Sequence, residues 1–351
     1  MGTLVLNPIA FSIGALQVHW YGLILGSGAL AGLLLAIWEG KRFKIPQEFF
    51  MDLLLFGVPS AIVGARIYFV AFKWDDYKDN LWDIFKIWNG GIAIYGALIG
   101  AIISAVILVR KRGYNFWRIA DISAPSLFIG QIIGRWGNFV NQEAYGGETT
   151  EAFLRDYLHL PTFIVNQMNI EGVFRHPTFL YESVWNLIGL FLLLILRRRK
   201  SLRAGELFCS YFIWYSIGRF FIEALRTDSL AFQGADWLAS FINGLWSPMV
   251  WLGFEQGYLA PSYGNVRISQ LLALLIVVVA VLFIILRRKT IPDLPRYLDP
   301  IVSTKASEMD SLAAPMPAQE AKAASEQDNK AISAEEANSH PKPDSTEDKK
   351  E

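Results

Sequence analysis

Long apolar stretches constrain this chain more than any other feature of its sequence. A helix needs about 20 apolar residues to cross roughly 30 Å of hydrocarbon. Seven stretches approach this requirement, at residues 17–38, 49–72, 90–109, 118–140, 178–196, 205–225 and 268–286. The composition, 53% hydrophobic and 14% aromatic, agrees with them. The sequence therefore predicts an all-α integral membrane protein with about seven transmembrane helices.

Lysine and arginine gather in alternate loops between these stretches. The basic residues are Lys41, Arg42, Lys44, Arg110, Lys111, Arg112, Arg118, Arg197, Arg198, Arg199, Lys200, Arg203, Arg287, Arg288 and Lys289. Cytoplasmic loops carry such an excess of positive charge. We therefore expect the N-terminus outside and the C-terminus inside, with residues 142–177 and 226–267 as external loops that form a small cap.

The chain is expected to divide into a transmembrane domain, residues 1–290, and a C-terminal tail, residues 291–351. From about residue 302 the tail is rich in Ala, Ser, Glu, Lys and Pro and has few large apolar residues. Such a composition buries too little apolar surface to offset the entropy of ordering. We expect a disordered, acidic cytosolic tail.

Two kinds of site are disfavoured by composition. The single cysteine, Cys209, excludes an intrachain disulfide, and the four histidines lack metal-ligand spacing. We expect no metal, no cofactor and no nucleic-acid partner.

Residues 134–147 carry an arginine, two asparagines and a glutamate where an apolar stretch ends. Ionisable groups at membrane depth must face the bundle interior or a watery cavity, so they indicate function. With the expected topology, polar residues from six stretches meet at the outer end. Arginine forks suit phosphate oxygens, which predicts a site for a phospholipid head group. A structural ion pair between Arg219 and Glu223 is an equally good interpretation of those two residues alone.

Five segments resemble, in order, the bacterial phosphatidylglycerol-prolipoprotein diacylglyceryl transferase family. They are residues 19–22 (HWYG), 64–66 (GAR), 134–143 (GRWGNFVNQE, followed by Gly146), 175–182 (RHPTFLYE) and 215–223 (YSIGRFFIE). The resemblance covers about residues 8–290, which would make residues 1–290 a catalytic domain.

The resemblance implies a reaction, its partners and a location. A diacylglyceryl group would move from phosphatidylglycerol to the lipobox cysteine thiol of a prolipoprotein signal peptide. A thioether would form and glycerol-1-phosphate would leave, as the first step of lipoprotein maturation. The enzyme would be a multi-pass protein of the bacterial plasma membrane, in contact with membrane lipid, with its active site toward the outer leaflet.

The resemblance also implies site residues. Arg135 and Arg219 correspond to phosphate-contacting arginines. The other catalytic or substrate-binding candidates are Tyr21, Arg66, Tyr95, Asn138, Glu143, Gly146, His176, Glu182, Tyr215, Glu223 and Arg226. One position departs from the family, because Tyr95 stands where many members have a histidine that is cast as the thiol-activating base. With an ordinary pKa near 10, tyrosine is a poor base at neutral pH. Either Tyr95 is a hydrogen-bonding or proton-relay group, or the role of the histidine is not universal in the family, and we hypothesise the first.

Two other functions compete with this interpretation. A transporter or channel could use the outer polar cluster as a vestibule, but an inverted repeat and a polar pathway on the inner side are not apparent. An enzyme acting on lipid head groups through a metal would need acidic ligands, and Asp75, Asp76, Asp79 and Asp83 lack a familiar metal-ligand spacing.

Overall fold

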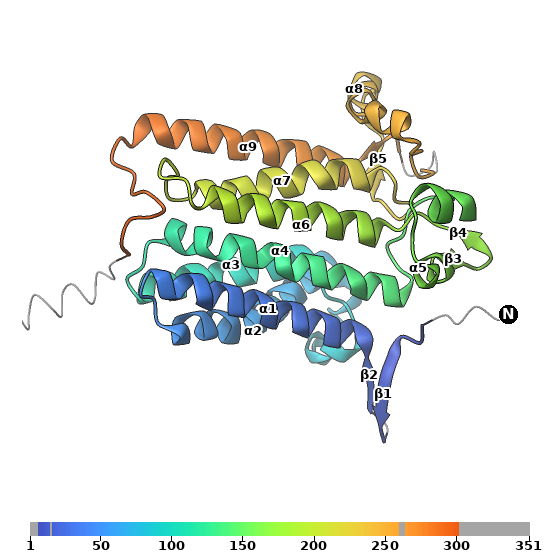
Figure 1. Ribbon diagram of the computed structural model, residues 1–351. Helices are drawn as coiled ribbons and strands as arrows, with labels where there is room; N and C mark the ends of the chain where they lie inside the picture. Colours follow the sequence, from blue (N-terminus) through green and yellow to red (C-terminus); the bar gives the residue numbers. More distant parts are fainter. Residues whose placement is uncertain (1–5, 15, 260–263, 302–351) are drawn as a thin grey trace, which may run out of the picture. The chain divides into compact units, whose positions relative to one another are not determined.

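The computed structural model describes residues 6–14, 16–259 and 264–301. The acidic tail expected from residue 302 lies outside this part of the chain. The long helices are α1 (Trp20–Arg42), α2 (Gln47–Phe72), α3 (Ile94–Lys111), α4 (Phe116–Asn141), α6 (Thr178–Leu196), α7 (Glu206–Glu223) and α9 (Ile268–Thr290) (Figure 1). Each of the seven predicted stretches thus forms a helix.

Five of the described helices are long and apolar enough to cross a membrane: α1, α2, α3, α6 and α9. The other two long helices carry more charge. Helix α4 contains Arg118, Asp121 and Arg135, and α7 contains Glu206, Arg219 and Glu223. These charged residues lower the hydropathy of both helices, although both pack lengthwise against apolar neighbours.

Helix α4 packs against α1, α6 and α7, while α7 also packs against α9. Figure 1 shows α4 between α1 and α6. Helices α2 and α3 form a separate hairpin whose backbones approach closely at three glycines. A Cβ atom on Gly96 would lie 2.3 Å from the carbonyl oxygen of Gly64, and one on Gly100 would lie 2.2 Å from that of Ser60. Only glycine permits this contact.

The all-α prediction was incomplete, because three short antiparallel sheets lie outside the long helices. Their strand pairs are β1 (Ile9–Ile13) with β2 (Leu16–His19), β3 (Asn169–Ile170) with β4 (Val173–Phe174), and β5 (Ala231–Phe232) with β6 (Val266–Arg267). Strands this short carry too little period-two alternation for sequence to separate them from loop.

The segments between the long helices contain short elements of their own. These are the 3₁₀ turns η1 (Trp74–Asp76), η2 (Leu81–Phe85) and η3 (Ile87–Asn89), the π-helical turn η4 (Phe153–Tyr157), α5 (Thr162–Gln167), α8 (Asp236–Trp246) and the 3₁₀ turn η5 (Ser247–Leu252). Helix α8 packs through buried Ile242 and Trp246 onto Phe220 of α7. The expected external loops are therefore built from packed elements.

Residues 291–301 fall within the predicted tail, yet they pack against the helices. Tyr297 is fully buried, and its hydroxyl donates to Glu39 Oε1 at 2.7 Å. Glu39 also pairs with Arg197 at 2.9 Å. The Arg118 guanidinium donates to the carbonyl oxygens of Arg296, Tyr297 and Asp299. A tail that begins at residue 291 therefore does not agree with the structure.

Candidate active site

Four charged side chains from α4, α6 and α7 form a connected ion cluster. Glu182 of α6 is buried and lies between two arginines: its Oε2 is 2.5 Å from Arg135 Nη2, and its Oε1 accepts from Arg219 Nη1 at 2.9 Å. Arg219 Nη2 also lies 2.5 Å from Glu223 Oε2, one turn farther along α7. The two arginine side chains stay about one fifth exposed, whereas the Glu182 side chain between them is 5% exposed.

The last turn of α4 extends this cluster. Arg135 Nη1 donates to Asn138 Oδ1 at 3.3 Å, and Asn138 Nδ2 donates to Glu143 Oε1 at 2.8 Å. Helix α4 ends at Asn141 because Gln142 takes a left-handed conformation (φ 50°), and its side chain donates to the Gln167 carbonyl at 2.7 Å. This turn of the chain brings Glu143 back toward Asn138.

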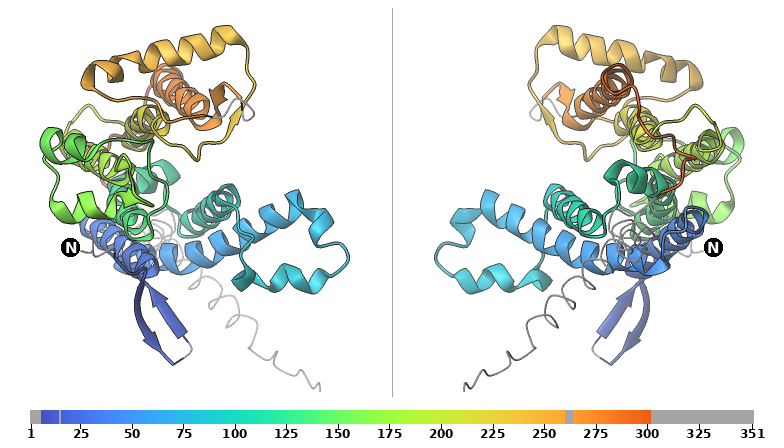
Figure 2. Two further views of the ribbon diagram at one scale, coloured as in Figure 1. Left: turned by 90° about the vertical axis from the view of Figure 1, so that its right-hand side faces the viewer. Right: turned by 90° about the vertical axis from the view of Figure 1, so that its left-hand side faces the viewer.

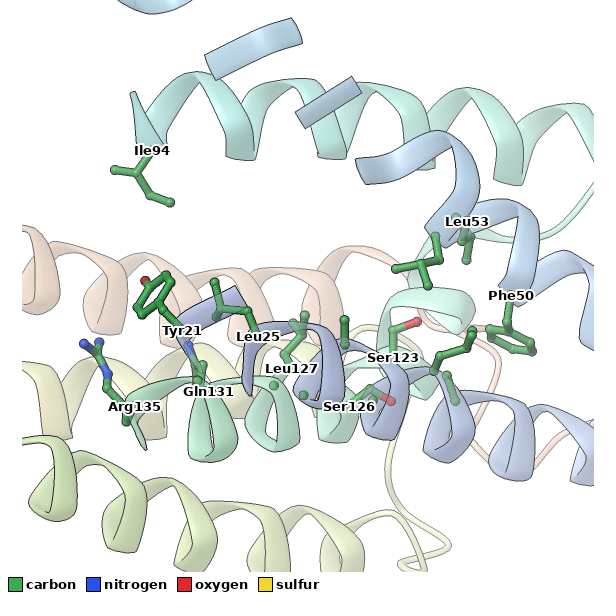
Figure 3. A pocket seen from close by; sticks show the side chains of 18 of the residues that line it. Tyr21, Leu25, Phe50, Leu53, Ile94, Ser123, Ser126, Leu127, Gln131 and Arg135 are labelled. Carbon is green, nitrogen blue, oxygen red and sulfur yellow. The ribbon is translucent and has the colours of Figure 1, made fainter. Parts of the chain in front are cut away.

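A cavity of about 630 Å³ begins at this cluster and runs between α1, α4 and the α2–α3 hairpin. Arg135, Asn138 and Tyr21 line one end, while Phe50, Leu53 and Ser123 line the other. Figure 3 shows Tyr21 and Arg135 together at one end, with Ile94 of α3 across the opening. From Ser123 to Asn138 the cavity follows α4 for about 22 Å, given a rise of about 1.5 Å per residue. The cavity is therefore an apolar groove with polar side chains at one end.

Gly146 joins the segment after α4 to the segments before α6 and after α7. Its N–H donates to the His176 carbonyl at 2.9 Å, and it forms a β-bridge with Arg226. A Cβ atom here would lie 2.7 Å from the His176 Cβ atom. His176 is buried, its Nδ1 lies 3.1 Å from the Tyr181 hydroxyl, and burial lowers its pKa to about 4. His176 is therefore neutral at pH 7 and supports the backbone.

The model of the prolipoprotein diacylglyceryl transferase family matches residues 8–286. The chain belongs to this family. A phosphatidylglycerol–prolipoprotein diacylglyceryl transferase of Listeria welshimeri is 51% identical over 287 residues, which cover 82% of this chain and 92% of that relative. One from Bacillus cereus is 49% identical over 294 residues, covering 84% and 97%. The family predicted from the sequence motifs is thus confirmed. Together with the five apolar helices, it identifies a multi-pass membrane protein.

Four other candidate residues make their described side-chain contacts with residues outside the ion cluster. The Arg66 guanidinium is buried and donates to backbone carbonyls of the α2–α3 loop. Tyr95 is 49% exposed at the start of α3, and no described hydrogen bond or ion pair joins it to the cluster. Arg226 pairs in a bidentate manner with Asp228. Tyr215 stacks on Tyr211, one turn before Arg219 on α7.

Sequence reasoning did not find the reciprocal contact between Trp185 of α6 and Trp214 of α7. Each indole N–H donates to the other residue's backbone carbonyl, at 2.8 and 2.9 Å. The rings lie against Gly218 and Gly189, where an added Cβ would meet indole atoms at 2.2 and 2.3 Å. A tryptophan and a glycine spaced four residues apart, once on each helix, are the only signal of this contact in the sequence.

Metal chemistry has no obvious centre in this part of the molecule. Among the described residues, no group of three or more His, Cys, Asp or Glu side chains is arranged to hold a metal ion. The charges at the cluster come from arginines and carboxylates alone.

Proposed function

We propose that this chain transfers the diacylglyceryl group of phosphatidylglycerol to the lipobox cysteine thiol of a prolipoprotein, forming a thioether and releasing glycerol-1-phosphate. One observation carries the proposal: in a member of this family, the Arg135–Glu182–Arg219 cluster adjoins the polar end of a long apolar cavity. A phospholipid that gives up its diacylglyceryl group and releases glycerol-1-phosphate needs both features.

The phosphate is proposed to bind near Arg135 and Arg219. In the structure Glu182 lies next to both guanidinium groups, one at each carboxylate oxygen, before substrate arrives. A guanidinium has five N–H donors, so each arginine retains donors for phosphate oxygens. Positive groups that are already oriented stabilise the charge that develops on the leaving phosphate without reorganising. Glu182 and Glu223 are therefore positioning residues in this proposal.

The acyl chains are proposed to lie in the cavity along α1 and α4. The side chains that line the cavity between Leu25 and Phe50 in space are mostly apolar. Strongly polar side chains line only the end near Arg135. A phospholipid whose chains enter this groove would present its glycerol carbon at the cluster. Holding lipid and peptide at one place removes much of the entropy barrier of a two-substrate reaction.

The chemical step is a displacement at the glycerol carbon that carries the phosphate. The peptide thiolate forms a C–S bond, the C–O bond breaks, and the electron pair leaves on the phosphate oxygen. The thiol must first lose its proton, because the thiolate is the nucleophile. We assign Glu143 as the acceptor of this proton. Its Oε1 accepts a hydrogen bond from Asn138 Nδ2 at 2.8 Å, which orients the carboxylate. Tyr95, which follows the cavity-lining Ile94 at the start of α3, is proposed to hydrogen-bond the incoming peptide.

The distribution of basic residues along the helices supports an active site toward the outer leaflet of the bacterial plasma membrane. In this proposal α4 and α7 cross the membrane together with the five apolar helices, which makes seven spans. Basic residues end α1, α3 and α9, and Arg197 follows α6 directly. The ion cluster lies near the opposite ends of the helices, away from these basic residues. The excess of positive charge assigns the basic end to the cytoplasm.

A reconstituted transfer assay tests the proposal. Purified protein would be given labelled phosphatidylglycerol and a lipobox peptide, beside the variants Arg135→Ala and Arg219→Ala. The matched control is Arg198→Ala, an exposed arginine just beyond α6. We expect the wild type and the control to form the thioether, and each site variant to lose at least a hundredfold in kcat/KM. Absence of thioether with wild-type protein would refute the proposal, and ion or solute flux in vesicles would then favour a transporter.

A further inference from the structure

Arg66 has an unusual set of partners. Its Nε donates to the Ile84 carbonyl at 2.8 Å, its Nη1 to those of Gly90 and Gly91 at 2.7 and 2.8 Å, and its Nη2 to that of Asp83 at 2.6 Å. The guanidinium also faces the Tyr77 ring at 5.0 Å. These carbonyls all belong to the loop between α2 and α3, residues 73–93, which we call the arm. One buried charge thus fixes the backbone of the arm against α2.

The close contact requires glycine in the arm. Gly91 has a positive φ of 73°, and a Cβ atom there would lie 2.5 Å from Arg66 Nη1. A backbone bond from the Ala93 N–H to the Ala65 carbonyl, at 3.1 Å, closes the end of the arm. These side-chain and backbone bonds together hold the arm in one shape against α2.

The shape of the arm leaves three large aromatic side chains exposed on the protein surface. Trp82, Phe85 and Trp88 are 76%, 68% and 76% exposed. Trp82 and Phe85 are three residues apart in η2, a spacing that places side chains on the same side, and Trp88 follows in the next 3₁₀ turn, η3, beyond Lys86. The rings of Trp82 and Phe85 lie 6.1 Å apart, which agrees with a shared face. The arm therefore presents an aromatic stripe, made of these three residues, that the rest of the described chain does not cover.

The position of the arm identifies what covers this stripe. The arm joins the ends of two apolar helices, and Figure 2 shows it at the free end of the α2–α3 hairpin. Phe72 and Ile94, at its two junctions, are 74% and 69% exposed, so the apolar surface of both helices continues into the arm. Tryptophan is enriched where a membrane meets water. These two observations favour a membrane over a protein partner as the surface that covers the stripe.

Charge indicates the chemistry of the contact. Residues 73–89 contain four aspartates and three lysines, so they carry no excess of positive charge. Two of the lysines pair within the arm, Lys78 with Asp75 at 2.8 Å and Lys86 with Asp83 at 2.6 Å. Attraction to anionic head groups therefore contributes little, and apolar insertion dominates.

We propose that the arm is a membrane-interface anchor. Its aromatic stripe inserts among the phospholipids of the outer leaflet, and the Arg66 clamp transmits that position to α2. Since α2 and α3 supply one wall of the cavity, the anchor sets how far that wall stands from α1 and α4. The inference rests on the proposed function only for the side of the membrane on which the arm lies.

Site-specific labelling tests the anchor. In full-length protein with Cys209→Ser, an environment-sensitive nitrobenzoxadiazole label would be attached after Phe85→Cys, and after Asp79→Cys as the matched control. Asp79 is an exposed arm residue outside the aromatic stripe. The protein would be placed in nanodiscs of phosphatidylcholine, with or without phosphatidylglycerol, and quenched either by lipid carrying a nitroxide near the head group or by aqueous iodide.

We expect the nitroxide lipid to quench the label at position 85 at least threefold more than at 79, and iodide to show the reverse order. Both results should be the same in the two lipid mixtures and at high salt. Equal iodide access at the two positions would overturn the anchor. Protection of position 85 only after addition of a lipobox peptide would also overturn it, since the stripe would then bind peptide. The transfer assay is read separately, so loss of the proposed function leaves the quenching result intact.

Discussion

The indole rings of Trp185 and Trp214 stack with their centroids 4.3 Å apart and an angle of 14° between their planes. Each ring also donates a hydrogen bond to the backbone of the other residue. This pair fixes the register of α6 against α7. Glu182 lies one turn before Trp185, and Arg219 follows Gly218, the residue against which the Trp185 ring packs. The register therefore sets the distance between Glu182 and Arg219.

The first prediction concerns this pair. Trp185→Phe and Trp214→Phe each keep an aromatic ring but remove one hydrogen bond, worth about 1 kcal/mol. We expect each variant to lower kcat about tenfold and to change the KM for lipid by less than threefold. The double variant should be little worse than either single variant, because the two bonds act as a unit. Trp251→Phe, at a position 90% exposed, is the control. Additive losses would contradict a shared positioning role.

A second prediction uses the close packing at Gly146. Gly146→Ala places a methyl group 2.7 Å from the His176 Cβ atom and 3.1 Å from the Leu225 carbonyl, so the backbone must shift. We expect a fall in thermal stability and loss of most transfer activity. Gly244→Ala, where nothing lies within 4 Å of the added carbon, should match the wild type in both measurements.

The proton acceptor can be tested by two substitutions that preserve shape. Glu143→Gln removes the proposed base and should lower kcat by a factor of about 10² or more. Tyr95→Phe removes only the hydroxyl of a side chain that is 49% exposed and should raise the KM for peptide, with kcat changed by less than tenfold. Initial rates over a range of peptide concentrations separate these effects. The opposite ranking would make Tyr95 the proton relay.

His176 makes stability depend on pH. Its folded-state pKa, about 4, lies below the ordinary value of 6.5, so between those values the unfolded chain binds more protons than the folded one. Stability should therefore rise as pH increases from about 4 to 6.5, by up to about 3 kcal/mol. Thermal unfolding in detergent measures this slope. His176→Gln should flatten it, and an unchanged slope would exclude His176 as its source.

The Arg66 clamp also has a testable consequence. Arg66→Lys keeps the charge, but a single ammonium cannot reach the four closest carbonyls that the planar guanidinium contacts. We expect the difference in quenching between labels at positions 85 and 79 to fall by at least half. A full difference in this variant would show that the arm keeps its shape without the clamp. The matched control is Arg110→Lys, at the opposite end of the α2–α3 hairpin.

Helix positions and the ion cluster followed largely from the sequence. Apolar stretch lengths placed all seven long helices, since hydrocarbon thickness fixes the number of residues needed. Arg135, Glu182, Arg219 and Glu223 were predicted to meet because assigned topology brings their helix ends to one side. The ion pairs among them agree with that prediction.

The role of Arg66 could not be predicted in the same way. An arginine nearly two turns from the end of an apolar helix, as Arg66 is in α2, has the same sequence context whether it faces a ligand or a loop. Its partners are backbone carbonyls, which leave no mark in the sequence. The tryptophan pair was missed for a related reason, because aromatic residues in apolar helices usually face lipid or a generic core.

The contact between Tyr297 and Glu39 has a consequence for how the protein is made. These residues are 258 positions apart, so a ribosome inserts α1 long before it synthesises the tyrosine. During that interval Glu39 has no phenol to bind, and Arg197 also arrives late. The end of the bundle that holds Glu39 therefore closes after α9 has been inserted. Chains that stop after α9 but before Tyr297 would retain every long helix and still fail to complete this final step of biogenesis.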